Sequence, residues 1–129
     1  MKSVDTNILV RLLTGDDPAQ YRKARKLFES SNIFIPDTVV LETEWVLRYA
    51  YSFHSKQICT AFRKLFGLSN VRLTNAMTVS QAITWHESGL DFADAMHLAA
   101  SLDHDQICTF DIKFAKKARS LCDCKVTLI

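Results

Sequence analysis

The chain has 129 residues, 48% of them hydrophobic, with only three glycines and two prolines. This length and composition allow one buried core, and we expect a single domain over residues 1–129. A formal net charge of +2 is too small to indicate nucleic-acid binding by itself. The sequence shows no apolar run long enough to cross a membrane and no signal peptide, so we expect a cytoplasmic protein without a membrane partner.

The cysteines are not spaced like a zinc site, because they form no C-x-x-C pair and no histidine stands at zinc-finger spacing. A domain of this size also needs no disulfide framework. We expect reduced and mostly buried thiols at Cys59, Cys108, Cys122 and Cys124.

Short apolar strands alternate with helices along the chain. Strands are predicted at residues 2–4, 33–35, 71–73, 106–110 and 126–128. Helices are predicted at about 8–13, 18–29, 38–51, 55–67, 77–87, 89–100 and 112–121. Asp17-Pro18 and Ser55 are expected at helix starts, and Gly15 and Gly67 at helix ends. This order predicts an α/β domain whose parallel sheet is covered by helices on both faces.

Two aspartates directly follow predicted strands. Asp5 ends the segment SVD, Asp111 ends the segment ICTFD, and a helix is expected after each. In open parallel sheets, ligands bind beyond the carboxyl ends of the strands. We therefore expect both carboxylates at the same edge of one sheet.

The segment GLDFADAMHLAA is a largely apolar helix that carries two aspartates near its start. Helical spacing places Asp91 and Asp94 at the border of its packed face, while His97 points largely away. A capping role can explain both acids, with Asp91 as the N-cap and Asp94 as the third helical residue. A metal-binding role for Asp94 is the alternative.

The helix expected at residues 38–51 also carries an acid on its apolar face. The i, i+3, i+4, i+7 spacing of such a face is followed by Glu42, Trp45, Val46 and Tyr49. Glu44 stands four residues before Arg48, as in exposed ion pairs, and is predicted at the surface. A buried Glu42 would need a proton, a cationic partner or a metal ion.

Four acids from distant parts of the chain can thus be placed independently in the interior or at a sheet edge. They are Asp5, Glu42, Asp94 and Asp111. Because no lysine or arginine shares their faces, they suggest hard oxygen ligands for Mg²⁺ or Mn²⁺. Such ions activate a water for phosphodiester hydrolysis. Basic runs such as Arg22-Lys23-x-Arg25-Lys26 would then hold the phosphate backbone.

The motifs VDTNILVRLLTGDDPAQ, IPDTVVLETEWVLR, GLDFADAMHLA and TFDIKFA resemble the PIN-domain ribonucleases, most closely the VapC toxins of toxin-antitoxin pairs. The resemblance runs from about residue 3 to the C-terminus and keeps all four acids in order. It implies that Asp5, Glu42, Asp94 and Asp111 are the catalytic metal ligands and that Asp91 assists. Thr6, Asn7 and Thr109 would orient these carboxylates.

The resemblance also implies a three-layer α/β/α fold with a parallel sheet of about five strands. The implied activity is a metal-dependent endoribonuclease that uses one or two Mg²⁺ or Mn²⁺ ions to hydrolyse RNA. The implied partners are a second copy of the chain, in a homodimer, and a VapB-like antitoxin.

Several alternatives stay open on the sequence. A PIN-like nuclease could process RNA outside a toxin-antitoxin pair, and in a non-catalytic binding domain the acids would only cap helices. A phosphoacceptor receiver domain is disfavoured, because the first strand ends in DTN without an adjacent acidic pair. Arg11 could contact phosphate or an antitoxin, or could simply be solvated. The four histidines are scattered, which does not favour metal-free acid-base cleavage.

Overall fold

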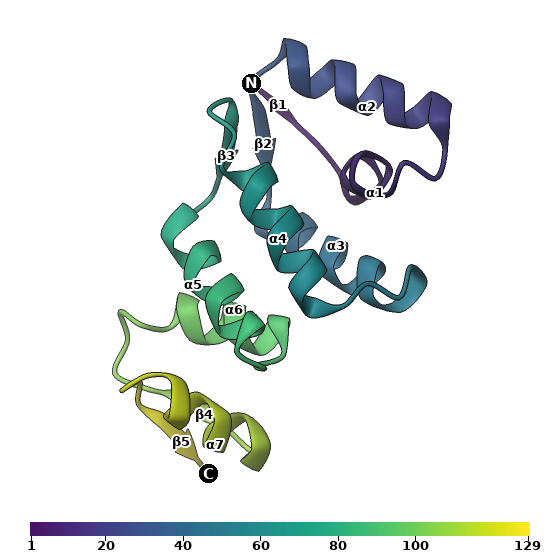
Figure 1. Cartoon of the computed structure of the whole chain (residues 1–129). Helices are drawn as coiled ribbons and strands as arrows, with labels where there is room; N and C mark the ends of the chain where they lie inside the picture. The colour runs from purple at the N-terminus through teal and green to yellow at the C-terminus, as the bar shows by residue number, and fades with distance from the viewer. The chain divides into compact units, whose positions relative to one another are not determined.

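The computed structural model describes residues 1–129, and the chain divides into two compact units, Met1–Ala76 and Met77–Ile129 (Figure 1). Seven helices alternate with five short strands, which confirms the mixed α/β class. No helix is both long enough and apolar enough to span a bilayer.

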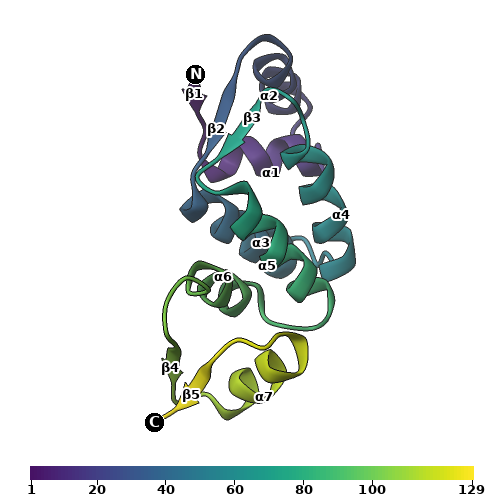
Figure 2. The ribbon, with the colours of Figure 1, turned by 90° about the vertical axis from the view of Figure 1, so that its left-hand side faces the viewer.

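The first unit is built on a parallel sheet. Its elements are β1 (Lys2–Ser3), α1 (Thr6–Thr14), α2 (Pro18–Ser30), β2 (Ile33–Ile35), α3 (Asp37–Ala50), α4 (Ser55–Phe66) and β3 (Val71–Leu73). The strand order is β1-β2-β3 with all strands parallel, so that Lys2 lies opposite Ile33 and Ile35 lies opposite Leu73. Helix α1 packs against α2 and α3, and α4 packs against α3 and β3. The three strands run side by side in Figure 2.

The second unit carries a separate, smaller sheet. It contains α5 (Ala76–Glu87) apart from its first residue, α6 (Phe92–Ala100), β4 (Ile107–Thr109), α7 (Ile112–Leu121) and β5 (Val126–Leu128). Strands β4 and β5 pair in parallel with each other, and α7 packs against β5. Figure 2 shows this compact arrangement of β4, β5 and α7.

The expected single sheet of about five strands is therefore wrong. The main sheet has three strands, and β4 and β5 form a two-stranded sheet of their own. The reason is the hydrogen-bonded pairing: Ile107 lies opposite Val126, and no strand of the main sheet pairs with β4. Because the strands form two sheets, their pairing does not give three layers around one sheet. Asp5 and Asp111 follow strands of different sheets, so the two carboxylates do not share one sheet edge.

Most helix ends follow the local signals in the sequence. The Asp17 side chain caps α2 ahead of Pro18, and Gly15 ends α1 in the left-handed conformation with a φ of 64°. The start of α4 differs slightly, because His54 is its N-cap and Ser55 is its first helical residue. The His54 backbone amide is satisfied by the side chain of Gln57, which explains the shift by one residue.

The buried face of α3 is not the one that the aromatic spacing predicts. Trp45 and Tyr49 are 56% and 63% exposed, and their rings contact each other with centroids 5.0 Å apart. Glu42 is exposed as well. The residues that α3 buries are Val40, Thr43, Glu44 and Leu47. Both sets follow the i, i+3, i+4, i+7 rule, so the spacing alone could not choose between the two faces.

Glu44 is accordingly buried and not at the surface as predicted. Its burial is compensated within the helix, because Arg48 donates to both carboxylate oxygens at 2.8 and 3.1 Å. A paired, hydrogen-bonded carboxylate can be buried where an isolated one cannot.

The cysteines also differ from the expectation of reduced, mostly buried thiols. Cys122 and Cys124 form a disulfide, which their Cα separation of 5.2 Å allows. Cys59 is buried with a free thiol, whereas Cys108 is free and exposed.

Candidate functional site

In the first unit, Asp5 and Glu42 are joined through one threonine. Asp5 follows β1, is exposed, and caps α1 by accepting a hydrogen bond from the Ile8 backbone N–H at 3.3 Å. The next residue, Thr6, is buried, and its hydroxyl donates to Oε1 of Glu42 on α3. This bond fixes the Glu42 carboxylate against the residue that follows Asp5.

In the second unit, the candidate acids stand at the starts of α6 and α7. Asp91 is the N-cap of α6 and accepts a hydrogen bond from the Asp94 backbone N–H at 3.2 Å. Asp111 follows β4, caps α7 by accepting from the Phe114 N–H at 2.9 Å, and is exposed. The Thr109 hydroxyl oxygen accepts from the Asp111 N–H at 3.0 Å.

Asp94 is partly buried near two other carboxylates of this unit. Partial burial raises the pKa of the Asp94 carboxyl above its ordinary value, and the charges of Asp91 and Asp111 raise it further. His97 acts in the opposite direction and is the smallest contribution. Asp94, Asp91 and Asp111 therefore lie close enough together for their charges to interact.

Helix capping accounts for part of this set. Asp5, Asp91 and Asp111 each accept a backbone N–H at a helix start, as a purely structural aspartate would. The predicted capping role of Asp91 and the position of Asp94 as the third residue of α6 are confirmed. Capping does not account for Glu42, which lies inside α3, or for the partly buried side chain of Asp94.

The donor set suits a hard divalent cation in its chemistry. The candidate ligands are carboxylates, with no cysteine or histidine among them, and oxygen donors of this kind favour Mg²⁺ or Mn²⁺ over zinc. No three acidic, histidine or cysteine side chains are gathered closely enough to form a metal site. The fit therefore rests on donor chemistry, and metal binding stays a prediction.

Arg11 has a structural role within the first unit. Its Nη1 donates to Asp16 at 3.2 Å and to the Tyr51 hydroxyl at 3.1 Å, and its Nε donates to Gln20 at 2.7 Å. The Tyr51 hydroxyl also donates to Asp16 at 2.6 Å. This hydrogen bond lowers the pKa of Asp16, and Thr14 and Arg11 act in the same direction. No local sequence pattern signals this network, because Tyr51 is distant from Arg11 along the chain.

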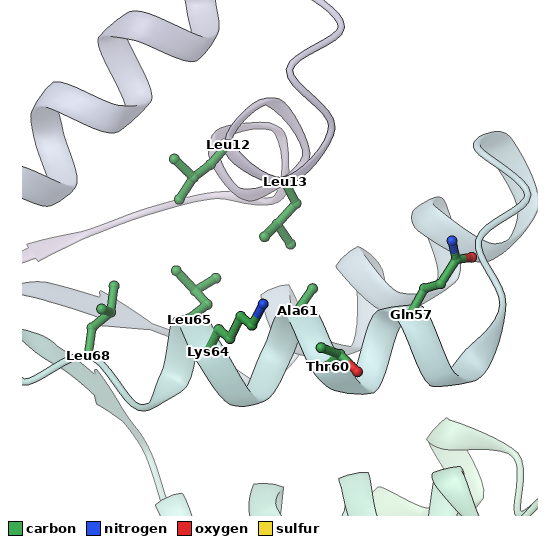
Figure 3. A pocket seen from close by; sticks show the side chains of 8 residues that line it. All are labelled: Leu12, Leu13, Gln57, Thr60, Ala61, Lys64, Leu65 and Leu68. Carbon is green, nitrogen blue, oxygen red and sulfur yellow. The ribbon is translucent and has the colours of Figure 1, made fainter.

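An apolar groove between α1 and α4 contains none of the candidate site residues (Figure 3). Its volume is about 590 Å³. Leu12 and Leu13 of α1 face Leu65 and Ala61 of α4 across it. Because the groove offers few polar groups, it cannot supply the acid or metal chemistry considered above.

The fold and the candidate site together define an α/β protein with parallel strands and acidic residues at strand ends and helix starts. The family model described as the PIN domain matches residues 2–120, and the chain belongs to this family. The family is generally one of nucleases, which supports hydrolase activity. The match spans residues of both compact units and includes every candidate site residue. No match was found among curated proteins.

Proposed function

We propose that the protein is a metal-dependent endoribonuclease in which four carboxylates bind one or two Mg²⁺ or Mn²⁺ ions. The proposed ligands are Asp5, Glu42, Asp94 and Asp111, with Asp91 assisting. The observation that carries the proposal is the PIN-family match, which includes all four acids. The hydrogen bond from Thr6 to Glu42, and the effect of the Asp91 and Asp111 charges on Asp94, give it additional support.

The reaction proposed is hydrolysis of an RNA phosphodiester by water, without a covalent enzyme intermediate, giving a 5′-phosphate and a 3′-hydroxyl. When bound, a divalent ion lowers the pKa of a water and neutralises charge on the leaving oxygen. The role of the surrounding side chains is to orient the carboxylates. Thr6 fixes the Glu42 carboxylate by a hydrogen bond, and Thr109 fixes the backbone at Asp111. Asn7, next to Thr6, is the third residue proposed to support the carboxylates.

The test is incubation of the purified protein with total cellular RNA in the presence of Mn²⁺ or Mg²⁺. We expect cleavage by the wild type, and loss of cleavage in EDTA and in Asp5→Asn and Asp94→Asn. Asp103→Asn is a matched control, because Asp103 is an exposed acid outside the proposed set. Cleavage that persists in EDTA, or in the Asp5 and Asp94 variants, would exclude this mechanism.

We further propose that the nuclease is the toxin of a toxin-antitoxin pair, acting in the cytoplasm as a homodimer and inhibited by a VapB-like antitoxin. The proposal rests on the ordered motifs shared with VapC toxins. A product of the neighbouring gene that copurifies with the protein and suppresses its cleavage of RNA would support it. A nuclease that acts outside such a pair would show no inhibitory partner.

A further inference from the structure

A second cavity of the first unit opens beside Asp5, between α1 and α2. Its volume is about 570 Å³, within the range of sites that bind small ligands. The α1 side is formed by Asp5, Asn7 and Ile8, and the α2 side by Gln20, Lys23 and Leu27. The cavity thus continues from a proposed metal ligand into a space lined by both polar and apolar groups.

Two cationic side chains, Arg11 and Lys23, line this cavity, and they differ in whether they can bind an added anion. Arg11, which also lines it, is held by Asp16, Tyr51 and Gln20, so its charge is already compensated. Lys23 is exposed and makes no ion pair or hydrogen bond. Lys23 can therefore direct its ammonium group at an anion without breaking an existing contact.

The apolar wall gives the cavity a second kind of binding surface. Ile8 and Leu27 are both half-buried, so part of each side chain stays accessible. A nucleobase or ribose can be buried against such a surface while polar neighbours meet its edges. Asn7 and Gln20 are exposed and supply amide donors and acceptors on opposite sides.

We propose that this cavity is a nucleotide subsite that holds one residue of the RNA next to the bond being cleaved. Lys23 binds the phosphate of that nucleotide, and Ile8 and Leu27 contact its base or ribose. The negative charge of Asp5 disfavours a phosphate directly beside it, so the phosphate lies on the α2 side. This inference rests on the proposed function, because Asp5 is taken to mark the reacting bond.

The chain offers a matched control for Lys23. Lys26 lies on the same helix and is also exposed, but it does not line the cavity. The probe is adenosine 5′-monophosphate, titrated in EDTA onto isotopically labelled protein and followed by amide chemical shifts. We expect shifts in α1 and α2, and affinity about fivefold to tenfold lower in Lys23→Ala than in Lys26→Ala. Lys23→Arg should keep most of the affinity, and inorganic phosphate alone should bind more weakly than the nucleotide.

Kinetics with a short RNA give a second readout. Lys23→Ala should raise KM with kcat within about twofold, because the subsite binds substrate away from the reacting atoms. Absence of RNA cleavage by the wild type would defeat the proposed function, while nucleotide binding in EDTA would still test the subsite. Equal nucleotide affinity in Lys23→Ala and Lys26→Ala would overturn the inference. Shifts confined to other elements, or produced by an acidic peptide but not by the nucleotide, would overturn it as well.

Discussion

Thr6 is the side chain through which α1 positions Glu42. Thr6 is a buried residue whose hydroxyl donates to the Glu42 carboxylate, while its neighbour Asp5 caps the same helix. A buried donor of this kind restricts the carboxylate to one orientation, as groups surrounding metal ligands commonly do. Thr6 therefore belongs among the positioning residues.

Replacing Thr6 by valine tests this role. Valine keeps the branched shape of threonine but cannot donate, so the Glu42 carboxylate loses its fixed orientation. We expect RNA cleavage to fall about 10-fold to 100-fold, with an unchanged far-ultraviolet circular dichroism spectrum. Thr6→Ser keeps the donor and should retain most of the activity. Full activity in Thr6→Val would mean that Glu42 needs no such support.

Asp94 makes stability depend on pH in a direction opposite to that of most acids. Its pKa is raised in the folded protein by burial and by Asp91 and Asp111, so the folded state keeps the proton to a higher pH than the unfolded chain. Ionisation of Asp94 therefore lowers stability as pH rises from its ordinary pKa of 3.8 through the raised value.

The variant Asp94→Asn removes this ionisation. In EDTA, we expect it to be more stable than the wild type near pH 7, by less than about 1 kcal/mol because partly exposed charges are screened. The difference should disappear at a pH well below 3.8, where Asp94 is protonated in both states. Urea unfolding at a series of pH values measures this, with Asp103→Asn as the control. A wild type that gains stability over Asp94→Asn as pH rises would contradict the assigned direction.

At the scale of elements, α3 presents two stripes with the same helical spacing. One consists of Glu42 with the aromatic pair Trp45 and Tyr49, and it is exposed. The other includes Leu47 and the Glu44 that Arg48 neutralises, and it is buried. The exposed stripe keeps Glu42 accessible on the surface of the unit.

Two substitutions on α3 should show, by the stability each one costs, which stripe is buried and which is exposed. Leu47→Ala should cost about 2–5 kcal/mol in the free energy of unfolding, because it leaves a cavity at a fully buried position. Trp45→Ala should cost no more than about 1 kcal/mol, although it removes the larger side chain, because that side chain is more than half exposed. Chemical denaturation followed by circular dichroism gives both values. A larger loss from Trp45→Ala would indicate that the aromatic pair is covered in solution.

The local features of these elements could be predicted from the sequence, whereas their partners could not. The capping by Asp17 and Asp91 and the helix end at Gly15 follow from the chemistry of a few neighbouring residues. The buried face of α3 depends on which neighbours it meets, and a pair such as Glu44 and Arg48 makes a polar stripe acceptable in the core. The link between Thr6 and Glu42 joins residues 36 positions apart, so spacing along one helix could not reveal it.

At the scale of the whole molecule, the strands were predictable but their pairing was not. The strands at Ile33–Ile35, Val71–Leu73 and Val126–Leu128 agree with the apolar runs, yet the five strands divide into two sheets. Strand pairing is decided by contacts between distant segments, for which one sequence carries little local signal. The acids at strand ends were found because the chemistry of their motifs is local. In the sequence, Lys23 is one member of a basic run. Its place in a cavity with Asp5 depends on the packing of α1 on α2, which the sequence pattern does not show.

The proposed metal binding should be visible in the stability of the whole chain. A cation that binds only the folded state, and not the unfolded chain, stabilises the fold by about 2.7 kcal/mol when its free concentration is 100 times its Kd. For a chain of this size, that corresponds to a rise in Tm of at least roughly 5 °C. Mn²⁺ titrated during thermal unfolding should produce this rise in the wild type and in Asp103→Asn, and much less of it in Asp5→Asn or Asp94→Asn. A Tm that saturating Mn²⁺ leaves unchanged would leave capping as the better explanation of the aspartates. A rise that survives in Asp94→Asn would place the ion away from the cluster around that residue.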